Sequence, residues 1–188
     1  DLVIKVQSVS INWVDLLMTS GLYQHAASLP YCPGLEYSGE VIWMGEEVKR
    51  PGLELGARVM NDGFMTGPRS SGGYQAYGGF CTYSVAPQDG VFVLPAHFSY
   101  AQGCNLLGNY ETAYHCLVAR GGLRSTDTVL IHGASGSTGL AAVHIAKLIG
   151  ATVIATGRSA EKLAIVKAQG ADHVVQTEVI AGERSDLR

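Results

Sequence analysis

The chain has 188 residues, a net charge of −3 and 15% charged residues, a balance that excludes the basic surface of a nucleic-acid-binding protein or of an electrostatic membrane anchor. Apolar residues make up 47% of the chain, but no run approaches the roughly 20 uncharged apolar residues of a membrane span. Four cysteines without a Cys-x-x-Cys pair favour reduced thiols in a cytoplasmic protein over a disulfide-rich or zinc-knuckle domain.

The first part of the chain, residues 1–105, contains short segments rich in β-branched and aromatic residues, each bounded by Gly, Pro, Asn or Asp. This pattern predicts an antiparallel, barrel-like domain. The expected strands are Leu2–Ile11, Gly39–Trp43, Ala57–Met60, Phe80–Val85 and Val91–Leu94. Residues 61–79 hold six glycines and little apolar periodicity, which predicts a long surface loop.

The second part, residues 106–188, alternates apolar strands with helical patterns. A helical run over Ala101–Val118 leads into it. Strands that alternate with helices predict right-handed βαβ units and a parallel sheet. The expected elements are strands Thr128–Ile131, Thr152–Ala155 and His173–Val175 and helices Ser137–Ile149 and Ala160–Gln169. The expected fold class is therefore a β domain followed by an α/β domain.

A glycine-rich turn joins the first of these strands to the first helix. Its three glycines allow a sharp turn, close approach of a ligand to the backbone and tight packing of the helix on the strand. The helix N-terminus then presents free amides to a pyrophosphate. A glycine turn alone also occurs without a ligand, but here it lies between strand and helix, as the dinucleotide motif requires. The residues expected to bind are Gly133, Ser135, Gly136, Ser137, Thr138 and Gly139.

The residues after the second strand bear on the choice between NAD and NADP. In NAD sites an acidic residue about 20 positions beyond the turn binds the ribose 2′-hydroxyl. At that place the chain has no carboxylate at the strand end but instead has Arg158, Ser159 and Lys162, which are suited to a 2′-phosphate. This favours NADPH. The alternative is that Ser159 caps the following helix while Arg158 and Lys162 point to solvent.

Several further motifs carry a family resemblance. They are Asn12-Trp13-Val14-Asp15 followed by Gly21-Leu22-Tyr23, then Pro33–Val41, Gly56–Val59, Gly78–Tyr83 and Thr112-Ala113-Tyr114. Together they resemble the medium-chain dehydrogenase/reductase superfamily, in its zinc-free quinone oxidoreductase branch. Gly56-Ala57-Arg58-Val59 departs from the usual G-D-R-V because it lacks the Asp.

The resemblance implies a GroES-like catalytic domain over residues 1–105, without its opening hairpin, and the first half of a Rossmann domain over residues 106–188. It further implies that substrate and nicotinamide meet in a cleft between the domains, with Thr112 near the nicotinamide. Zinc members of the family carry Cys where this chain has Asn12 and His where it has Leu35, so no metal is expected. The neighbours His115 and Cys116 are interpreted as helix packing.

Without a Lewis acid, the expected acceptor is one that takes hydride readily. The expected reaction is therefore NADPH-dependent reduction of a small electrophile, a quinone or a conjugated enone. Tyr23 is expected to hydrogen-bond the acceptor oxygen and to donate a proton, Asn12 to orient the substrate or nicotinamide, and Asp15 to titrate near the site. Alternatively, Tyr23 is a wall residue and Asp15 bonds its own turn. Glu36 is interpreted as a buried, paired structural residue.

Two other functions stay open. The chain also suits an enoyl-thioester reductase of the same superfamily, although Leu17 stands where such enzymes carry Asn. Because family members are nearly twice this length, a truncated or purely nucleotide-binding protein is the third interpretation. The full-length form is expected to be a homodimer, without nucleic-acid or membrane partners.

Overall fold

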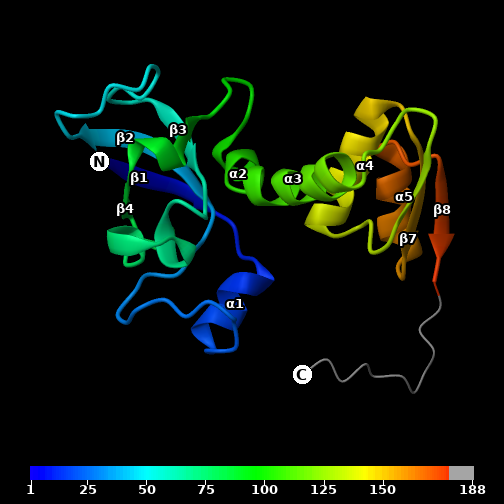
Figure 1. Cartoon of the computed structure of the whole chain (residues 1–188), viewed down its shortest axis with the longest axis horizontal. Coiled ribbons are helices and arrows are strands. Elements are labelled where there is room, and N and C mark those ends of the chain that lie inside the picture. Colours follow the sequence, from blue (N-terminus) through cyan, green and yellow to red (C-terminus); the bar gives the residue numbers. More distant parts are fainter. Residues whose placement is uncertain (178–188) are drawn as a thin grey trace. The chain divides into compact units, whose positions relative to one another are not determined.

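The structure, a computed structural model, describes residues 1–177. The chain divides into two compact units, residues 1–108 and a second unit that starts at Asn109 (Figure 1). Residues 178–188, which the sequence assigns to the second domain, lie outside the described residues. Within residues 1–177 no helix has both the length and the apolar character needed to cross a membrane.

The first unit is built on a five-stranded antiparallel sheet with the strand order β4-β1-β2-β3-β5. Its side chains alternate between the two faces, so that Leu2 and Ile4 are fully buried whereas Lys5 is exposed. The core consists of Leu2, Ile4, Tyr37, Val41, Leu53, Val59, Ala86 and Val91. The strands are β1 (Leu2–Val9), β2 (Tyr37–Met44), β3 (Arg58–Asn61), β4 (Tyr83–Ala86) and β5 (Val91–Val93). The expected antiparallel class is confirmed.

Strand β1 ends two residues earlier than the sequence predicts. After Val9 the chain turns, and Asn12 becomes the N-cap of the short helix α1 (Trp13–Thr19). The expected loop over residues 61–79 contains two single-turn 3₁₀ helices, Gly67–Arg69 and Gly72–Tyr74. A third such turn, Gln88–Gly90, precedes β5.

The expected range Ala101–Val118 is mostly helical, as the sequence predicts, but it is not one continuous helix. It is divided into α2 (Tyr100–Gly103), α3 (Leu107–Tyr114) and a π-helical segment (His115–Arg120). Gly103 ends α2 where a Cβ would come within 2.6 Å of the Leu94 side chain, so close packing, rather than helix propensity, decides this boundary.

The second unit contains a three-stranded parallel sheet with the order β6-β7-β8. The strands are β6 (Thr128–Ile131), β7 (Thr152–Gly157) and β8 (His173–Gln176), and the helices are α4 (Ser137–Ile149) and α5 (Ala160–Ala168). This confirms the expected α/β class with parallel strands and crossover helices.

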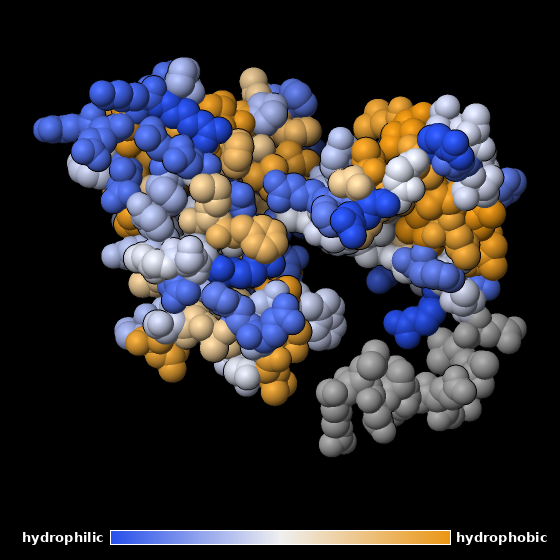
Figure 2. All heavy atoms as spheres, in the orientation of Figure 1, coloured by the Kyte–Doolittle hydropathy of each residue, from blue (hydrophilic) through white to orange (hydrophobic). Residues whose placement is uncertain are grey.

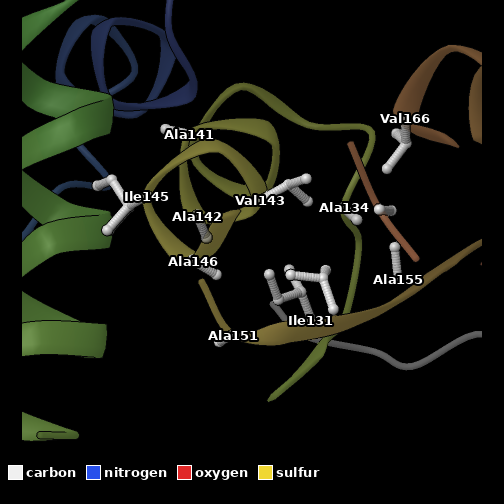
Figure 3. Packing of buried hydrophobic residues seen from close by; sticks show 13 residues of the cluster. Ile131, Ala134, Ala141, Ala142, Val143, Ile145, Ala146, Ala151, Ala155 and Val166 are labelled. Atoms are coloured by element: carbon white, nitrogen blue, oxygen red, sulfur yellow. The ribbon is translucent and has the colours of Figure 1, made fainter. Parts of the chain in front are cut away.

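Small side chains line the contact between α4 and this sheet. Ala141, Ala142 and Ala146 are buried on α4, together with Val143 and Ile145. Figure 3 shows Ala146 directed toward Ile131 on β6. Larger apolar residues also reach the surface of both units (Figure 2), among them Trp13 on α1 and Leu148 on α4.

Candidate functional site

The glycine turn after β6 is a tight and open backbone structure. Gly133 has a φ of +62°, a conformation that favours glycine, and a Cβ added there would meet nothing within 4 Å. The Ala134 N–H donates to the Thr156 carbonyl at 3.0 Å, which fastens the turn to the end of β7. A Cβ at Gly139 would lie 2.5 Å from the Gly133 oxygen. Position 139 therefore requires glycine.

Helix α4 begins directly after this turn and has its N-terminus at the surface. Gly136 is its N-cap, and the side chains of Ser135, Ser137 and Thr138 are exposed. The amides of the first turn have no acceptor within the helix, and no acidic side chain stands in that turn. Exposed amides at the positive end of a 13-residue helix carry a partial positive charge that favours a nearby anion.

The loop after β7 adds positive charge. Arg158 and Lys162 are exposed, and the backbone of Arg158 is held because Gln176 donates to its carbonyl at 3.1 Å. The Ser159 hydroxyl accepts a hydrogen bond from the Lys162 N–H at 3.3 Å, so Ser159 acts as the helix cap that the sequence left as an alternative. The open turn, the first-turn amides and the adjacent cations together present hydrogen-bond donors and positive charge suited to a phosphate-bearing ligand.

Helix α3 is held against the N-terminal part of α4 by polar contacts. The Thr138 hydroxyl donates to the Asn109 amide oxygen at 2.9 Å, and the Tyr110 hydroxyl lies 2.6 Å from Nδ1 of His144. Thr112 lies on the same short helix and is exposed. The structure therefore places α3, which carries Thr112, next to α4, whose first turn presents the exposed amides.

In the first unit, Asp15 is a buried carboxylate with an exposed fraction of 2%. Its Oδ2 accepts from the Asn12 N–H at 2.9 Å and its Oδ1 from the Leu35 N–H at 3.0 Å. Both oxygens thus bond backbone amides, one at the start of α1 and the other before β2. The bond from Asn12 is the contact within its own turn that the alternative describes, and the bond from Leu35 fastens that turn to the residues before β2.

Asn12 and Glu36 form a second hydrogen-bonded group. The Asn12 amide nitrogen donates to Ser10 Oγ at 2.9 Å and to Glu36 Oε2 at 3.0 Å. Because an amide nitrogen has only two hydrogens, these two bonds use the full donor capacity of the Asn12 side chain, which also takes part in the capping box at the start of α1. Glu36 Oε1 accepts from the Gly108 N–H at 2.6 Å. Burial raises the pKa of the Glu36 carboxyl above its usual range, although these hydrogen bonds oppose the shift.

The sequence predicts that Glu36 is buried and paired because it lies between apolar neighbours. It does not indicate which residues form hydrogen bonds with Glu36. Asn12 precedes Glu36 by 24 positions and Gly108 follows it by 72. Only the folded chain brings the three together.

Tyr23 lies apart from this hydrogen-bonded group. It follows Gly21, which has a φ of +70°. This left-handed residue and the hydrogen bond from the Leu22 N–H to the Leu17 carbonyl at 2.8 Å end α1. The side chain is half-buried. Within residues 1–177 its hydroxyl makes no hydrogen bond, so it is available to a ligand.

The described residues offer no cluster of three or more His, Cys, Asp or Glu side chains that could hold a metal ion. Leu35 is aliphatic and buried, and the Asn12 amide nitrogen is fully occupied by Ser10 and Glu36. His115 and Cys116 are exposed neighbours on the π-helical segment.

Two family models match the chain. The alcohol dehydrogenase GroES-like domain matches residues 1–96, and the zinc-binding dehydrogenase model matches residues 137–186. Among curated proteins, the chain is 33% identical over 171 residues to a quinone oxidoreductase of Lama guanicoe, covering 91% of this chain and 48% of that protein. It is 34% identical over 162 residues to a highly reducing polyketide synthase of Penicillium soppii, covering 86% and 6%.

Solved structures of oxidoreductases also resemble this chain. A probable oxidoreductase from Mycobacterium abscessus has a TM-score of 0.79 and 34% identity, covering 94% of this chain and 52% of that one. The quinone oxidoreductase from Thermus thermophilus, solved also in complex with NADPH, has a TM-score of 0.74 and 28% identity, covering 93% and 50%. The chain thus spans about half the length of these two oxidoreductases.

Proposed function

Because the chain belongs to the medium-chain dehydrogenase/reductase family, we propose that it is part of an NADPH-dependent oxidoreductase that passes hydride to a quinone or a conjugated enone. The observation that carries this proposal is the exposed N-terminus of α4 behind the glycine turn, with Arg158 and Lys162 at the end of β7. The quinone oxidoreductases among its relatives support the same conclusion.

The residues of each unit have distinct parts in this proposal. The first-turn amides of α4 bind the pyrophosphate, and Arg158 and Lys162 bind the 2′-phosphate. The reduced nicotinamide of the bound coenzyme supplies the hydride. Tyr23 donates a hydrogen bond and then a proton to the acceptor oxygen. Asn12 orients the substrate or the nicotinamide, and Asp15 and Glu36 hold Asn12 in place.

The residues do not fit a zinc ion, although the second family description names one. Leu35 has no donor atom, and the amide of Asn12 is a poor substitute for a thiolate. An alcohol substrate needs help in losing its proton and in polarising its product, whereas a quinone or enone accepts hydride without that help. We therefore assign an electrophilic acceptor and a zinc-independent reaction.

Coenzyme titration tests the proposal directly. NADPH is expected to quench protein fluorescence in a saturable way and to bind at least tenfold more tightly than NADH, because a hydrogen bond to a charged group contributes roughly 1.5–3 kcal/mol. Arg158→Glu is expected to remove most of this preference, whereas Arg120→Glu, the same change on the exposed end of the π-helical segment, should leave it intact. Equal affinities of the unaltered protein for NADPH and NADH would refute the choice of NADPH.

An acceptor panel separates the proposal from its nearest alternative. The similarity to a segment of a polyketide synthase favours an enoyl-thioester reductase as the second candidate. NADPH consumption is expected with a quinone and an alkenal and not with an enoyl-CoA. The reverse preference would select the second candidate, and binding without consumption of any acceptor would leave a nucleotide-binding protein.

Tyr23→Phe tests the catalytic assignment. Loss of the hydroxyl removes the proton donor but keeps the ring, so kcat is expected to fall by about 100-fold with little change in KM. The matched control is Tyr74→Phe, whose hydroxyl contacts Asp1 at the surface. An unchanged kcat for Tyr23→Phe would show that Tyr23 is a wall residue.

A further inference from the structure

Cys32 and Cys81 lie on two segments of the first unit that run side by side. The Phe80 N–H donates to the Pro33 carbonyl at 2.9 Å, so the residues directly next to the two cysteines are hydrogen-bonded to each other. A Cβ at Gly78 would lie 2.1 Å from the Cys32 carbonyl oxygen. The absence of a side chain at position 78 thus lets the two backbones touch beside the cysteines.

The same pairing brings the two cysteines near each other. The Gly79 N–H donates to the Gly34 carbonyl at 2.7 Å, so Cys32 stands opposite Cys81 in the register of the two segments. The sulfur of Cys81 lies 2.9 Å from the carbonyl oxygens of Gly78 and Tyr83. Both cysteines are partly accessible, in contrast to the buried Cys104. Peroxide-sized molecules therefore have access to both sulfurs.

We propose that Cys32 and Cys81 are a redox-responsive thiol pair that closes to an intramolecular disulfide when the protein meets hydrogen peroxide. Nothing in the proposed hydride transfer uses either sulfur, so this property is independent of the proposed function. The bond would close a loop of about 50 residues and thereby restrict the unfolded chain.

The two sulfurs have different parts in the reaction. Burial raises the pKa of the Cys81 thiol to about 11, and the neighbouring Cys32 thiol adds to this shift. Cys81 therefore stays protonated at neutral pH, so we assign the attack on the peroxide to the sulfur of Cys32, which loses its proton in this step. The O–O bond breaks, Cys32 becomes a sulfenic acid, and hydroxide leaves. Cys81 then attacks the oxidised sulfur as it loses its proton, the S–S bond forms and water leaves. In total, one peroxide takes two electrons from the two thiols and becomes two waters.

Peptide mapping of the intact protein tests the pair without any substitution. The reduced protein is treated with a small excess of hydrogen peroxide, remaining thiols are blocked with N-ethylmaleimide, and the protein is digested with trypsin and chymotrypsin. Cleavage after Phe80 and Tyr83 separates Cys81 from Cys104 and Cys116. We expect a linked Cys32–Cys81 peptide pair that is lighter than the two reduced peptides by two hydrogens and that disappears with dithiothreitol.

Variants distinguish this pair from adventitious oxidation. Cys116→Ser removes an exposed thiol and should keep the link, whereas Cys32→Ser should lose it and leave Cys81 open to alkylation. If Cys32 and Cys81 of the unaltered protein are blocked to the same extent with and without peroxide, the proposal fails. It also fails if they are found only in disulfides between two protein molecules or with Cys104 or Cys116.

Discussion

Position 139 has no room for a side chain. A Cβ added there would lie 2.5 Å from the Gly133 carbonyl oxygen and 2.8 Å from the Ala134 Cα. Both atoms belong to the backbone, which cannot move aside as a flexible side chain could. Gly139→Ala is expected to lower the free energy of unfolding by about 2 kcal/mol, although alanine has the better helix propensity. Urea denaturation measures this. Gly73→Ala, where a Cβ meets open space, is the control, and an equal effect of the two substitutions would refute the close approach.

The buried Glu36 makes stability depend on pH. Its folded-state pKa is raised above the usual 4.5, mainly by desolvation, so the folded protein holds this proton more tightly than the unfolded chain. The stability that the proton brings is complete below pH 4.5 and is lost as the pH rises through the raised value. Glu36→Gln keeps a carbonyl acceptor for Gly108 and is expected to remove this loss.

Urea unfolding at a series of pH values from 4.5 upward tests this prediction. The wild-type protein should lose stability relative to Glu36→Gln as the pH rises. The exposed Glu47→Gln controls for removing one negative charge. Parallel curves for wild type and Glu36→Gln would contradict a raised pKa.

At the scale of elements, Asp172 ties α4 to the sheet of the second unit. Its Oδ2 accepts from the Val153 N–H at 2.7 Å and from Lys147 Nζ at 2.8 Å. The bond from Lys147 and then that from Val153 lower the pKa of this carboxyl below its usual 3.8. The folded state thus favours the ionised form, and this contribution to stability is present above pH 3.8 and lost as the pH falls through the lowered value.

Asp172→Asn is therefore expected to reduce stability at pH 7, with a difference from wild type that shrinks as the solution is acidified below pH 3.8. A double-mutant cycle with Lys147→Gln, followed by urea unfolding at pH 7, isolates the coupling between the two side chains. Additive effects of the two substitutions would show that the ion pair does not couple α4 to the sheet.

The elements around the glycine turn could be predicted from the sequence because local signals fix both ends. Strand β6 and helix α4 match the expected ranges residue for residue. Gly136 caps α4 and Gly150, with a φ of +94°, ends it. The turn itself followed from the spacing of its glycines.

The element boundaries that differ from the expected ones depend on residues distant in the chain. The run Ala101–Val118 is broken at Gly103, which packs on Leu94, and α1 is held by the bond between Asp15 and Leu35. In the same way, the contact of Asn12 with Glu36 and the backbone pairing beside Cys32 and Cys81 join segments with no shared local pattern. Only the folded chain reveals such pairs.

At the scale of the whole molecule, each unit has a core of its own, and both tryptophans, Trp13 and Trp43, lie in the first unit. Val143→Ala removes fully buried methyl groups from the second core and is expected to cost about 2 kcal/mol there. The far-ultraviolet circular dichroism transition should shift to lower urea, while the tryptophan fluorescence midpoint stays in place.

Val41→Ala, in the core of the first unit, is the matched control and should move the fluorescence midpoint. If Val143→Ala shifts both signals together, the two cores unfold as one cooperative block.

The alanines beneath α4 have a consequence for how such a protein can change. A methyl group has no rotamers, so Ala141, Ala142 and Ala146 offer nothing that can rearrange when a new ligand arrives, unlike Val143 and Ile145 on the same helix. Larger residues at the alanine positions would lift the helix off its strands. Evolution toward a different coenzyme has its freedom instead in the exposed loop after β7, where Arg158 can be exchanged without repacking anything.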